Sequence, residues 1–300
     1  MYNNSNYYNE IKKNLLKCEI YDREKDYSKE RNRVITYFEN GRLLAEAGKK
    51  YGENIIGEYA NRLMLEVGKK YNARTLRRIR QFYIAFSNIK WSPMATTLSW
   101  SHYTELLPIK DSNKLMYYLD IAIKQRLTKR TLRERIKSNE YERLPLETKN
   151  KLITQGQLDV NDLIPNPIII KSSGLNEEIT EYALKQLILN NLDAFLNQLG
   201  IGFTYVGNEY KIKLNNTYNY IDLLLYNIKY KCYVVIELKV TELKKEHTGQ
   251  IMTYMNYIDE NIKTLEENDT VGIIICKQDN KYVIKYCSDK RIISRTYEII

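Results

Sequence analysis

The chain has few residues of the kinds that build zinc sites, disulfide frameworks or membrane spans. Only two of its 300 residues are histidines, His102 and His247, so catalysis built on a histidine base has few candidates. Its four cysteines show no CxxC spacing, which disfavours a zinc site and is typical of reduced thiols in a cytosol. No run approaches the about 18 uninterrupted apolar residues of a membrane span, and the first residues lack the apolar core of a secretory signal. We therefore expect a cytoplasmic protein that makes no use of a membrane.

The basic charge is concentrated in one half of the chain. Residues 1–150 hold 30 Lys and Arg against 18 Asp and Glu, whereas residues 151–300 hold 17 against 19. This asymmetry is expected of a module that binds a polyanion and is joined to a second module of another kind. A basic domain without a nucleic-acid partner is the alternative.

Helical periodicity dominates the basic half. We expect residues 1–27 to be a frayed lead-in or a short helix, and residues 28–140 to form an all-α domain. Apolar residues three and four positions apart predict four of its helices, over residues 28–51, 55–67, 112–125 and 128–138. Thr128 is a candidate N-cap for the last of these helices.

An arginine-rich helix follows a short turn in this domain. Gly68 and Asn72 punctuate the turn, and a new helix is predicted to start near Ala73. Helix, turn and helix in this order suggest a helix-turn-helix unit, whose second helix can lie in a DNA major groove. The second helix carries four arginines that suit phosphate or guanine recognition: Arg74, Arg77, Arg78 and Arg80. An ordinary solvated helix face is the alternative, and the charge asymmetry favours nucleic acid.

The second half combines helices with strand-like runs. Residues 141–176 hold three prolines and little periodicity, so we expect a connector that is not a free linker. An amphipathic helix is predicted over residues 177–199 and another over residues 244–262. Strands are predicted over residues 202–214, 219–226, 232–238, 271–277 (VGIIICK) and 281–287 (KYVIKYC). The predicted fold class is α+β: an N-terminal all-α domain, then an α/β core with a mixed sheet over residues 177–300.

Three charged residues interrupt the apolar hairpin YIDLLLYNIKYKCYVVIELKV at residues 220–240. Asp222 lies in the first strand, and Glu237 and Lys239 share one face of the second because side chains alternate along a strand. A surface salt bridge at a strand end is the alternative, but charges are rarely buried without a partner. Two carboxylates brought together repel each other unless a cation lies between them. Oxygen ligands of this kind suit Mg²⁺ or Mn²⁺.

The spaced Asp222, Glu237 and Lys239 resemble the core of the PD-(D/E)XK nucleases. The longer string YIDLLLY…CYVVIELK…EHTGQIMTYM resembles the YhcG-type branch, in which this core follows a helical DNA-binding domain. The resemblance extends from about Val34 to the end of the chain. The residue before Asp222 is Ile221, whereas the superfamily name has proline there; members of the superfamily tolerate other residues at this position. The resemblance implies a restriction-endonuclease-like core and a Mg²⁺-dependent DNA endonuclease, with Mn²⁺ able to substitute.

The resemblance also implies roles for residues outside the hairpin. Glu181 on the preceding helix would complete the metal shell with Asp222 and Glu237, although Glu177 and Glu178 compete for this role. Gln250 and Tyr254 lie four residues apart on the following helix and so share one of its faces. Gln250 would orient water or contact a phosphate, and Tyr254 would stack on sugar or base; an ordinary core role for Tyr254 is the alternative.

Two further readings concern the whole chain. A DNA-binding adaptor or mobile-element accessory protein whose nuclease core no longer cuts is the alternative function, and the intact Asp222, Glu237 and Lys239 argue against it. RNA as the substrate is a third alternative, although the sequence holds no RNA-binding signature that supports it. A homodimer is plausible, because one active site per chain favours two copies for cutting both strands.

Overall fold

The computed structural model describes residues 3–23, 28–87, 98–154, 156–172 and 179–300, without the side chains of Leu163 and Cys287. The chain forms two compact units, Met1–Ser138 and Asn139–Ile300. The predicted Glu177 and Glu178 lie outside the described residues. No helix among the described residues is long and apolar enough to cross a membrane.

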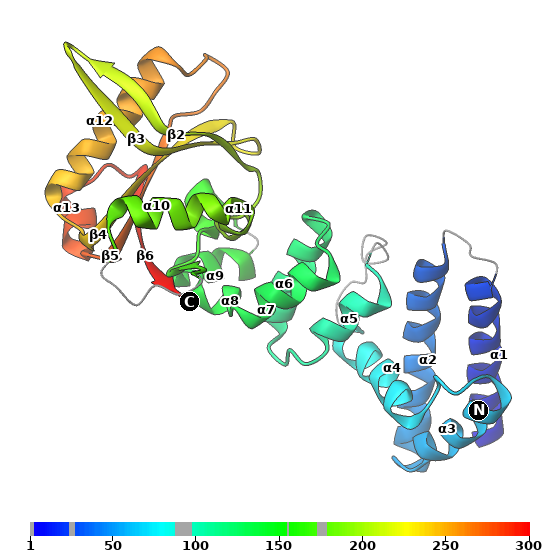
Figure 1. Cartoon of the computed structure of the whole chain (residues 1–300). Helices are drawn as coiled ribbons and strands as arrows, with labels where there is room; N and C mark the ends of the chain where they lie inside the picture. The colour runs from blue at the N-terminus through cyan, green and yellow to red at the C-terminus, as the bar shows by residue number, and fades with distance from the viewer. Residues whose placement is uncertain (1–2, 24–27, 88–97, 155, 173–178) are drawn as a thin grey trace. The chain divides into compact units, whose positions relative to one another are not determined.

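The first unit is helical throughout its described part, as the periodicity predicts (Figure 1). Its helices are α1 (Asn4–Arg23), α2 (Lys29–Tyr51), α3 (Ile55–Glu66), α4 (Ala73–Phe86), α5 (Trp100–Leu106), α6 (Ser112–Lys124) and α7 (Lys129–Lys137). Two predicted helix starts carry side-chain caps: Asn72 Oδ1 accepts from the Thr75 backbone N–H at 3.0 Å, and Thr128 Oγ1 accepts from Thr131 N–H at 3.1 Å.

Of the two alternatives for residues 1–27, the structure shows the helix, which is longer than predicted and belongs to this unit. Helix α1 buries one side, including Tyr8, Ile11 and Leu15, and packs along α2. The Arg62 guanidinium lies 3.6 Å from the Tyr8 ring centroid, a cation–π contact that joins α1 to α3. The extent of this helix was hard to predict, because its many Asn and Tyr residues have modest helix propensity and its packing decides the conformation.

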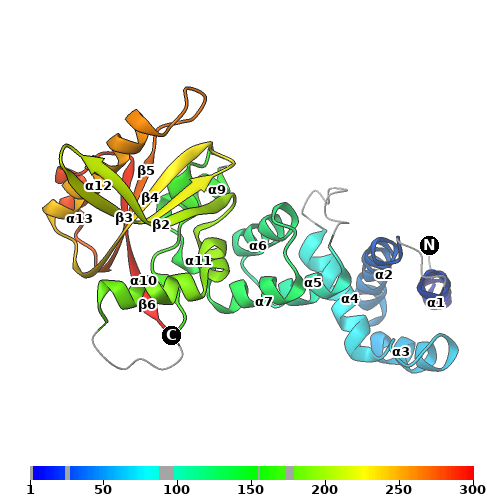
Figure 2. The same ribbon diagram turned by 45° about the horizontal axis from the view of Figure 1, so that its top comes forward.

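The second unit is built on a mixed six-stranded sheet, which confirms the predicted fold class (Figure 2). The strands are β1 (Ile168–Ile170), β2 (Phe203–Leu214), β3 (Thr217–Asn227), β4 (Cys232–Glu242), β5 (Val271–Gln278) and β6 (Ile292–Ile299). Their order is β1-β6-β5-β4-β3-β2. Strands β2, β3 and β4 form an antiparallel meander, whereas β4, β5, β6 and β1 run parallel.

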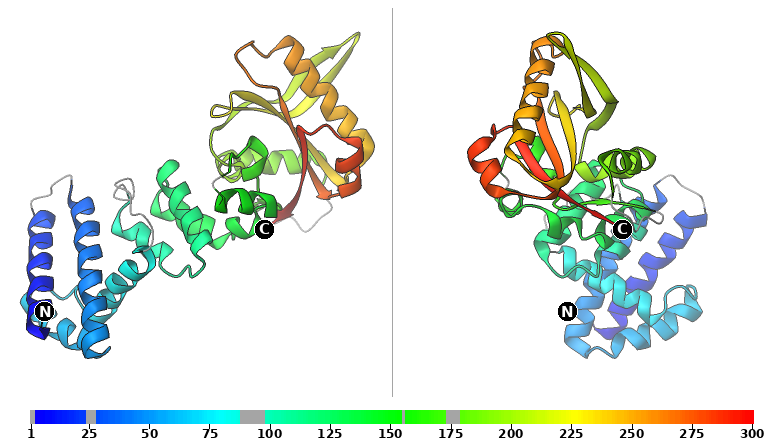
Figure 3. Two further views of the ribbon diagram at one scale, coloured as in Figure 1. Left: turned by 180° about the vertical axis from the view of Figure 1, so that it is seen from behind. Right: turned by 60° about the vertical axis from the view of Figure 1, so that its left-hand side comes forward.

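Helices cover both faces of this sheet (Figure 3). Helices α10 (Glu181–Asn190) and α11 (Leu192–Leu199) pack on the face that carries Leu223, Ile236 and Ile273. Helix α12 (Lys245–Asn261) packs on the other face, over Leu224 and Val235. The single helix predicted over residues 177–199 is therefore two helices, which meet at Asn191.

The strand predicted at KYVIKYC is wrong, and the predicted connector, expected not to be a free linker, has structure of its own. KYVIKYC forms helix α13 (Lys281–Cys287), because Asn280 Oδ1 accepts from the backbone N–H groups of Tyr282 and Val283 and caps a helix start. The missing strand is β6, which lies after it. The predicted connector contains α8 (Glu140–Arg143), α9 (Leu146–Ile153), a 3₁₀ turn (Val160–Leu163) and β1. It belongs to the second unit, since β1 pairs with β6.

Candidate active site

The register of β3 and β4 brings the predicted charged residues together. Leu223 pairs with Ile236 across the antiparallel ladder, so the next step of the register sets Asp222 against Glu237. Asp222 Oδ2 accepts a hydrogen bond from the Leu238 backbone N–H at 2.9 Å, which fixes the carboxylate against β4. Side-chain alternation along β4 places Glu237 and Lys239 on one face, opposite the buried Leu238.

Lys239 and Glu237 form a buried ion pair. Lys239 Nζ donates to Glu237 Oε1 at 2.8 Å, and both residues are buried. Glu237 is 3% exposed, and its second oxygen, Oε2, has no hydrogen-bond partner among the described residues. Burial, and then the nearby Asp222 carboxylate, raises the pKa of Glu237 to about 7. The raised pKa shows that the negative charge of Glu237 is poorly stabilised in its buried position, even beside Lys239.

Burial lowers the pKa of the Lys239 ammonium, but Glu237, Glu181 and Asp222 together outweigh this effect and raise it. Lys239 therefore carries its positive charge at neutral pH.

Helix α10 contributes one predicted and one unpredicted residue. Glu181, the first residue of α10, places its Oε2 atom 3.7 Å from Lys239 Nζ, so the structure brings the predicted Glu181 to the site. One turn later, the Lys185 Nζ atom lies 2.9 Å from Glu209 Oε1 and 3.4 Å from Asp222 Oδ1. Lys185 is 8% exposed. The sequence indicated only that Lys185 shares a helix face with Glu181, because the two residues are four positions apart.

Gln250 and Tyr254 lie on α12 and contact each other. Gln250 Nε2 donates to the Tyr254 hydroxyl at 3.0 Å. Tyr254 is 5% exposed and packs in the core on the α12 face, which raises the pKa of its hydroxyl through burial. The ring therefore has almost no free surface for stacking on a base, so the core alternative describes Tyr254. Its hydroxyl instead orients Gln250.

The two histidines have structural contacts. His247 Nδ1 accepts from the Lys244 backbone N–H at 3.2 Å, at the start of α12. The ring nitrogens of His102 lie 2.7 Å from Ser99 Oγ and 3.0 Å from the Leu127 carbonyl oxygen.

The donor set of the site suits a hard divalent cation. No three His, Cys, Asp or Glu side chains in the described ranges are spaced to enclose a metal ion. Nevertheless, Asp222, Glu237 and Glu181 supply only oxygen atoms, and the buried Glu237 Oε2 lacks a partner. Oxygen ligands of this kind, with one buried carboxylate oxygen left unpartnered, suit Mg²⁺ or Mn²⁺.

In the first unit, three of the four predicted arginines are free to meet a ligand. Arg74, Arg77 and Arg78 are exposed along α4, and no described residue forms an ion pair or hydrogen bond with their side chains. Arg80 differs, because its Nη1 atom lies 2.6 Å from Glu53 Oε2. It therefore joins α4 to the segment before α3.

Comparison with known proteins assigns both parts of the chain. Residues 161–299 match the YhcG PDDEXK nuclease domain, and residues 22–143 match the DUF1016 N-terminal domain. The chain is 23% identical over 282 residues to "Putative nuclease YhcG" of Escherichia coli (strain K12), a match that covers 82% of this chain and 74% of that protein.

Two solved structures resemble part of the chain. One is a repair endonuclease from Pyrococcus abyssi, with 16% identity, a TM-score of 0.29 and coverage of 42% of this chain and 49% of that one. The other is an EndoMS–dsDNA2 complex, with 15% identity, a TM-score of 0.28 and coverage of 43% and 48%. The chain thus spans about half the length of each solved structure. On its two matching domains, the chain belongs to the YhcG-type PD-(D/E)XK nuclease family.

Proposed function

We propose that the protein is a divalent-metal-dependent DNA endonuclease that hydrolyses phosphodiester bonds at the β3–β4 hairpin. The observation that carries this proposal is the meeting of Asp222, Glu237 and Lys239 at one point, with one buried carboxylate oxygen left unpartnered. A salt bridge that served only stability would pair its charges more completely.

Each residue has a role in this proposal. Asp222, Glu237 and Glu181 hold the cation, which supplies Lewis acidity and a more acidic bound water. Lys239 carries its charge at neutral pH and stabilises the negative charge that develops on the phosphate. Gln250, held by the Tyr254 hydroxyl, positions water or a phosphate oxygen.

The helical unit supplies DNA binding in this proposal. Arg74, Arg77 and Arg78 are exposed on one short helix and have no carboxylate partner in the described part of the chain. Guanidinium groups of this kind bind phosphates. A homodimer would provide two active sites for two strands, and sedimentation as a strict monomer on DNA would contradict that part of the proposal.

The test is cleavage of a plasmid, a linear duplex and a four-way junction with Mg²⁺, Mn²⁺ or EDTA. We expect wild-type protein to cut only with metal. Asp222→Asn and Lys239→Ala should each lose at least about 100-fold in rate, because the first weakens the metal site and the second removes a positive charge at the reacting phosphate. Circular dichroism of each variant checks that it is folded. Tight DNA binding without cutting under either metal would replace this proposal with the adaptor function.

A further inference from the structure

Helix α13 presents two lysine–tyrosine pairs to solvent. Lys281 and Tyr282 are followed one turn later by Lys285 and Tyr286, so like residues share a helix side. Tyr282 is 77% exposed and Tyr286 is 69% exposed, while both lysines are also exposed. The Lys285 Nζ atom lies 5.0 Å from the Tyr286 ring centroid. Large aromatic side chains in such exposed positions contribute nothing to the core and are available to a partner.

Helix α13 is fixed beside the strand that carries the candidate site. Its N-cap, Asn280, donates from Nδ2 to Glu242 Oε1 at 3.0 Å. Glu242 ends β4 three residues after Lys239 and pairs with Gln278 of β5. Because β4 and β5 are parallel, their carboxyl ends lie at the same edge of the sheet, and α13 starts there (Figure 1). A strand of substrate leaving the catalytic hairpin along this edge would reach α13.

A basic pocket borders the same helix. It has a volume of about 430 Å³ and is lined by Lys281, Lys285, Arg143 and Arg295, with Glu142 and Asp279 as its two carboxylates. The Asp279 carboxylate already accepts from the Ser294 hydroxyl.

Arg295 gives this pocket a fixed positive charge. Its guanidinium donates to the backbone carbonyls of Asn161, Ile164 and Ser294, at 3.1, 2.9 and 2.8 Å. These are neutral acceptors, and the Asp279 and Asp162 carboxylates act on the guanidinium only at longer range, without a hydrogen bond to it. The lining therefore suits an anion of phosphate type.

We propose that α13 and this pocket bind a single-stranded segment of the DNA substrate. Lys281, Lys285 and the pocket hold backbone phosphates, and Tyr282 and Tyr286 stack on unpaired bases. Aromatic side chains interleaved with lysines bind single strands because each unpaired base offers a free face, whereas the bases of a duplex are already stacked. This inference rests on the proposed function, since it names the form of DNA that the nuclease holds.

The first test measures affinity without cleavage. Fluorescence anisotropy with the full chain in EDTA compares a single-stranded oligonucleotide with the blunt duplex of the same sequence. We expect Tyr282→Ala/Tyr286→Ala to weaken single-strand binding about tenfold or more and to leave duplex binding within about twofold. Lys281→Gln/Lys285→Gln should weaken binding of both DNAs. For the single strand, the slope of log affinity against log salt concentration should fall by about 0.7 for each lysine removed.

A matched control removes a tyrosine elsewhere in the same unit. Tyr218 on β3 is 54% exposed and lies 3.8 Å from Lys211 Nζ, measured to its ring centroid. Tyr218→Ala should bind both DNAs as wild type does. Equal losses in Tyr218→Ala and in the α13 variant, or no loss in the α13 variant, would overturn the inference.

The second test locates the contact directly. Single-stranded DNA containing 5-bromodeoxyuridine is crosslinked to wild-type protein by ultraviolet light, and the adducts are mapped by mass spectrometry. Adducts at Tyr282 or Tyr286 support the inference; adducts confined to other segments, or none, contradict it. The experiments separate this inference from the proposed function. If the α13 variants bind single strands normally and the protein cuts DNA, only this inference is contradicted. If DNA binds through α13 and is not cut, only the proposed function is contradicted.

Discussion

Two buried lysines share the carboxylates of the candidate site. Lys239 contacts Glu237, and Lys185 contacts Asp222. Strand alternation and the hairpin spacing were enough to predict Asp222, Glu237 and Lys239, because their positions depend on local register. Lys185 could not be predicted in the same way, since its contact with Asp222 depends on how α10 lies on the sheet.

Lys185 is predicted to position Asp222. Lys185→Met removes the ammonium between Asp222 and Glu209, so we expect the cleavage rate to fall about 10- to 100-fold while DNA affinity in EDTA stays unchanged. Lys185→Arg keeps the charge and should recover part of the rate. A wild-type rate in Lys185→Met would show that Asp222 needs no such support.

At the scale of elements, one glycine sets how closely α2 and α4 approach. A Cβ atom on the buried Gly41 of α2 would lie 2.5 Å from the Ile79 carbonyl oxygen and 2.6 Å from Tyr83 Cβ. Both neighbouring atoms belong to or adjoin the α4 backbone, so they move only if the helix moves. The contact of α2 with α4 therefore requires a residue without a side chain.

Gly41→Ala should destabilise the helical unit by about 1–3 kcal/mol, because it overpacks this crossing. The measurement is urea unfolding followed by far-ultraviolet circular dichroism. Gly57→Ala on α3 is the matched control, since a Cβ there meets nothing within 4 Å; it should be neutral or stabilising by up to about 1 kcal/mol. Similar effects at the two glycines would show that helix packing is not responsible.

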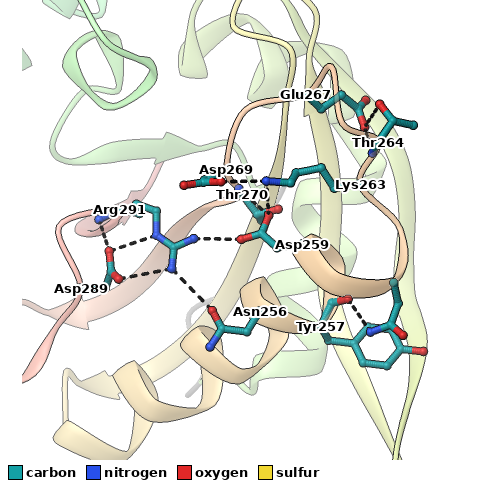
Figure 4. Close-up of polar contacts among 11 residues, drawn as sticks. Asn256, Tyr257, Asp259, Lys263, Thr264, Glu267, Asp269, Thr270, Asp289 and Arg291 are labelled. Atoms are coloured by element: carbon teal, nitrogen blue, oxygen red, sulfur yellow. Dashed lines mark hydrogen bonds and ion pairs between the residues drawn. The ribbon is translucent and has the colours of Figure 1, made fainter.

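The end of α12 is tied to the start of β6 by an ion network (Figure 4). Arg291 donates to Asp259 Oδ2 at 2.9 Å and to Asp289 Oδ1 at 3.1 Å, and Lys263 lies 2.7 Å from Asp269 Oδ1. The hydrogen bonds from Arg291 hold the pKa of Asp289 below its usual range. This network holds together segments that are adjacent in the sheet layers but not in sequence.

Arg291→Gln should lower the free energy of unfolding by about 1–2 kcal/mol at pH 7, because the network is partly exposed. An Asp whose pKa is depressed by folding contributes stability above its unfolded pKa of about 3.9 and loses it as the pH falls through the folded value. The difference from wild type should therefore shrink below about pH 4. Thermal melts across this range measure the difference, with Lys277→Gln, an exposed lysine of β5 outside the network, as the control. A constant difference at all pH values would contradict the prediction.

The elements that sequence periodicity predicted well were the long ones with one apolar face. Helices α2, α3, α6, α7 and α12 and the β2–β4 meander all lie within one or two residues of the predicted ranges, apart from longer ends on β3 and β4, and α4 starts at the predicted Ala73. Helix α13 was missed because its residues favour strands and only the Asn280 cap and its surroundings decide the helix. Strand β1 was missed because three residues form a strand only beside a partner distant in sequence.

Across the whole molecule, the basic charge and the candidate catalytic residues lie in different parts of the chain. The excess of Lys and Arg lies in residues 1–150, whereas the candidate catalytic residues belong to the second unit. The division could be predicted because charge and periodicity change along the chain. The position of the boundary could not, since α8, α9 and β1 show their membership of the second unit only through tertiary contacts.

Arg74→Gln/Arg77→Gln/Arg78→Gln should weaken duplex DNA binding and reduce its salt dependence by about 0.9 in slope for each phosphate that the variant no longer neutralises. Metal-dependent cutting at saturating DNA should remain near the wild-type rate. The matched control compares the DNA affinity of Arg77→Gln with that of Arg130→Gln. Arg130 is an exposed arginine of α7 that pairs with Glu134. An equal loss of affinity in both single variants would mean that general basic charge, not α4, binds DNA.

The pairing of β1 with β6 has a consequence for how the chain matures. During synthesis, β1 leaves the ribosome well before β6, and more than a hundred residues separate Ile168 from its partner Tyr297. Until β6 arrives, the outer edge of β5 and the apolar Ile168–Ile170 have nothing to pair with. Exposed strand edges of this kind invite pairing with other chains. A nascent chain therefore depends on β6 to pair with both segments, and we expect chaperone binding to be strongest before β6 is made.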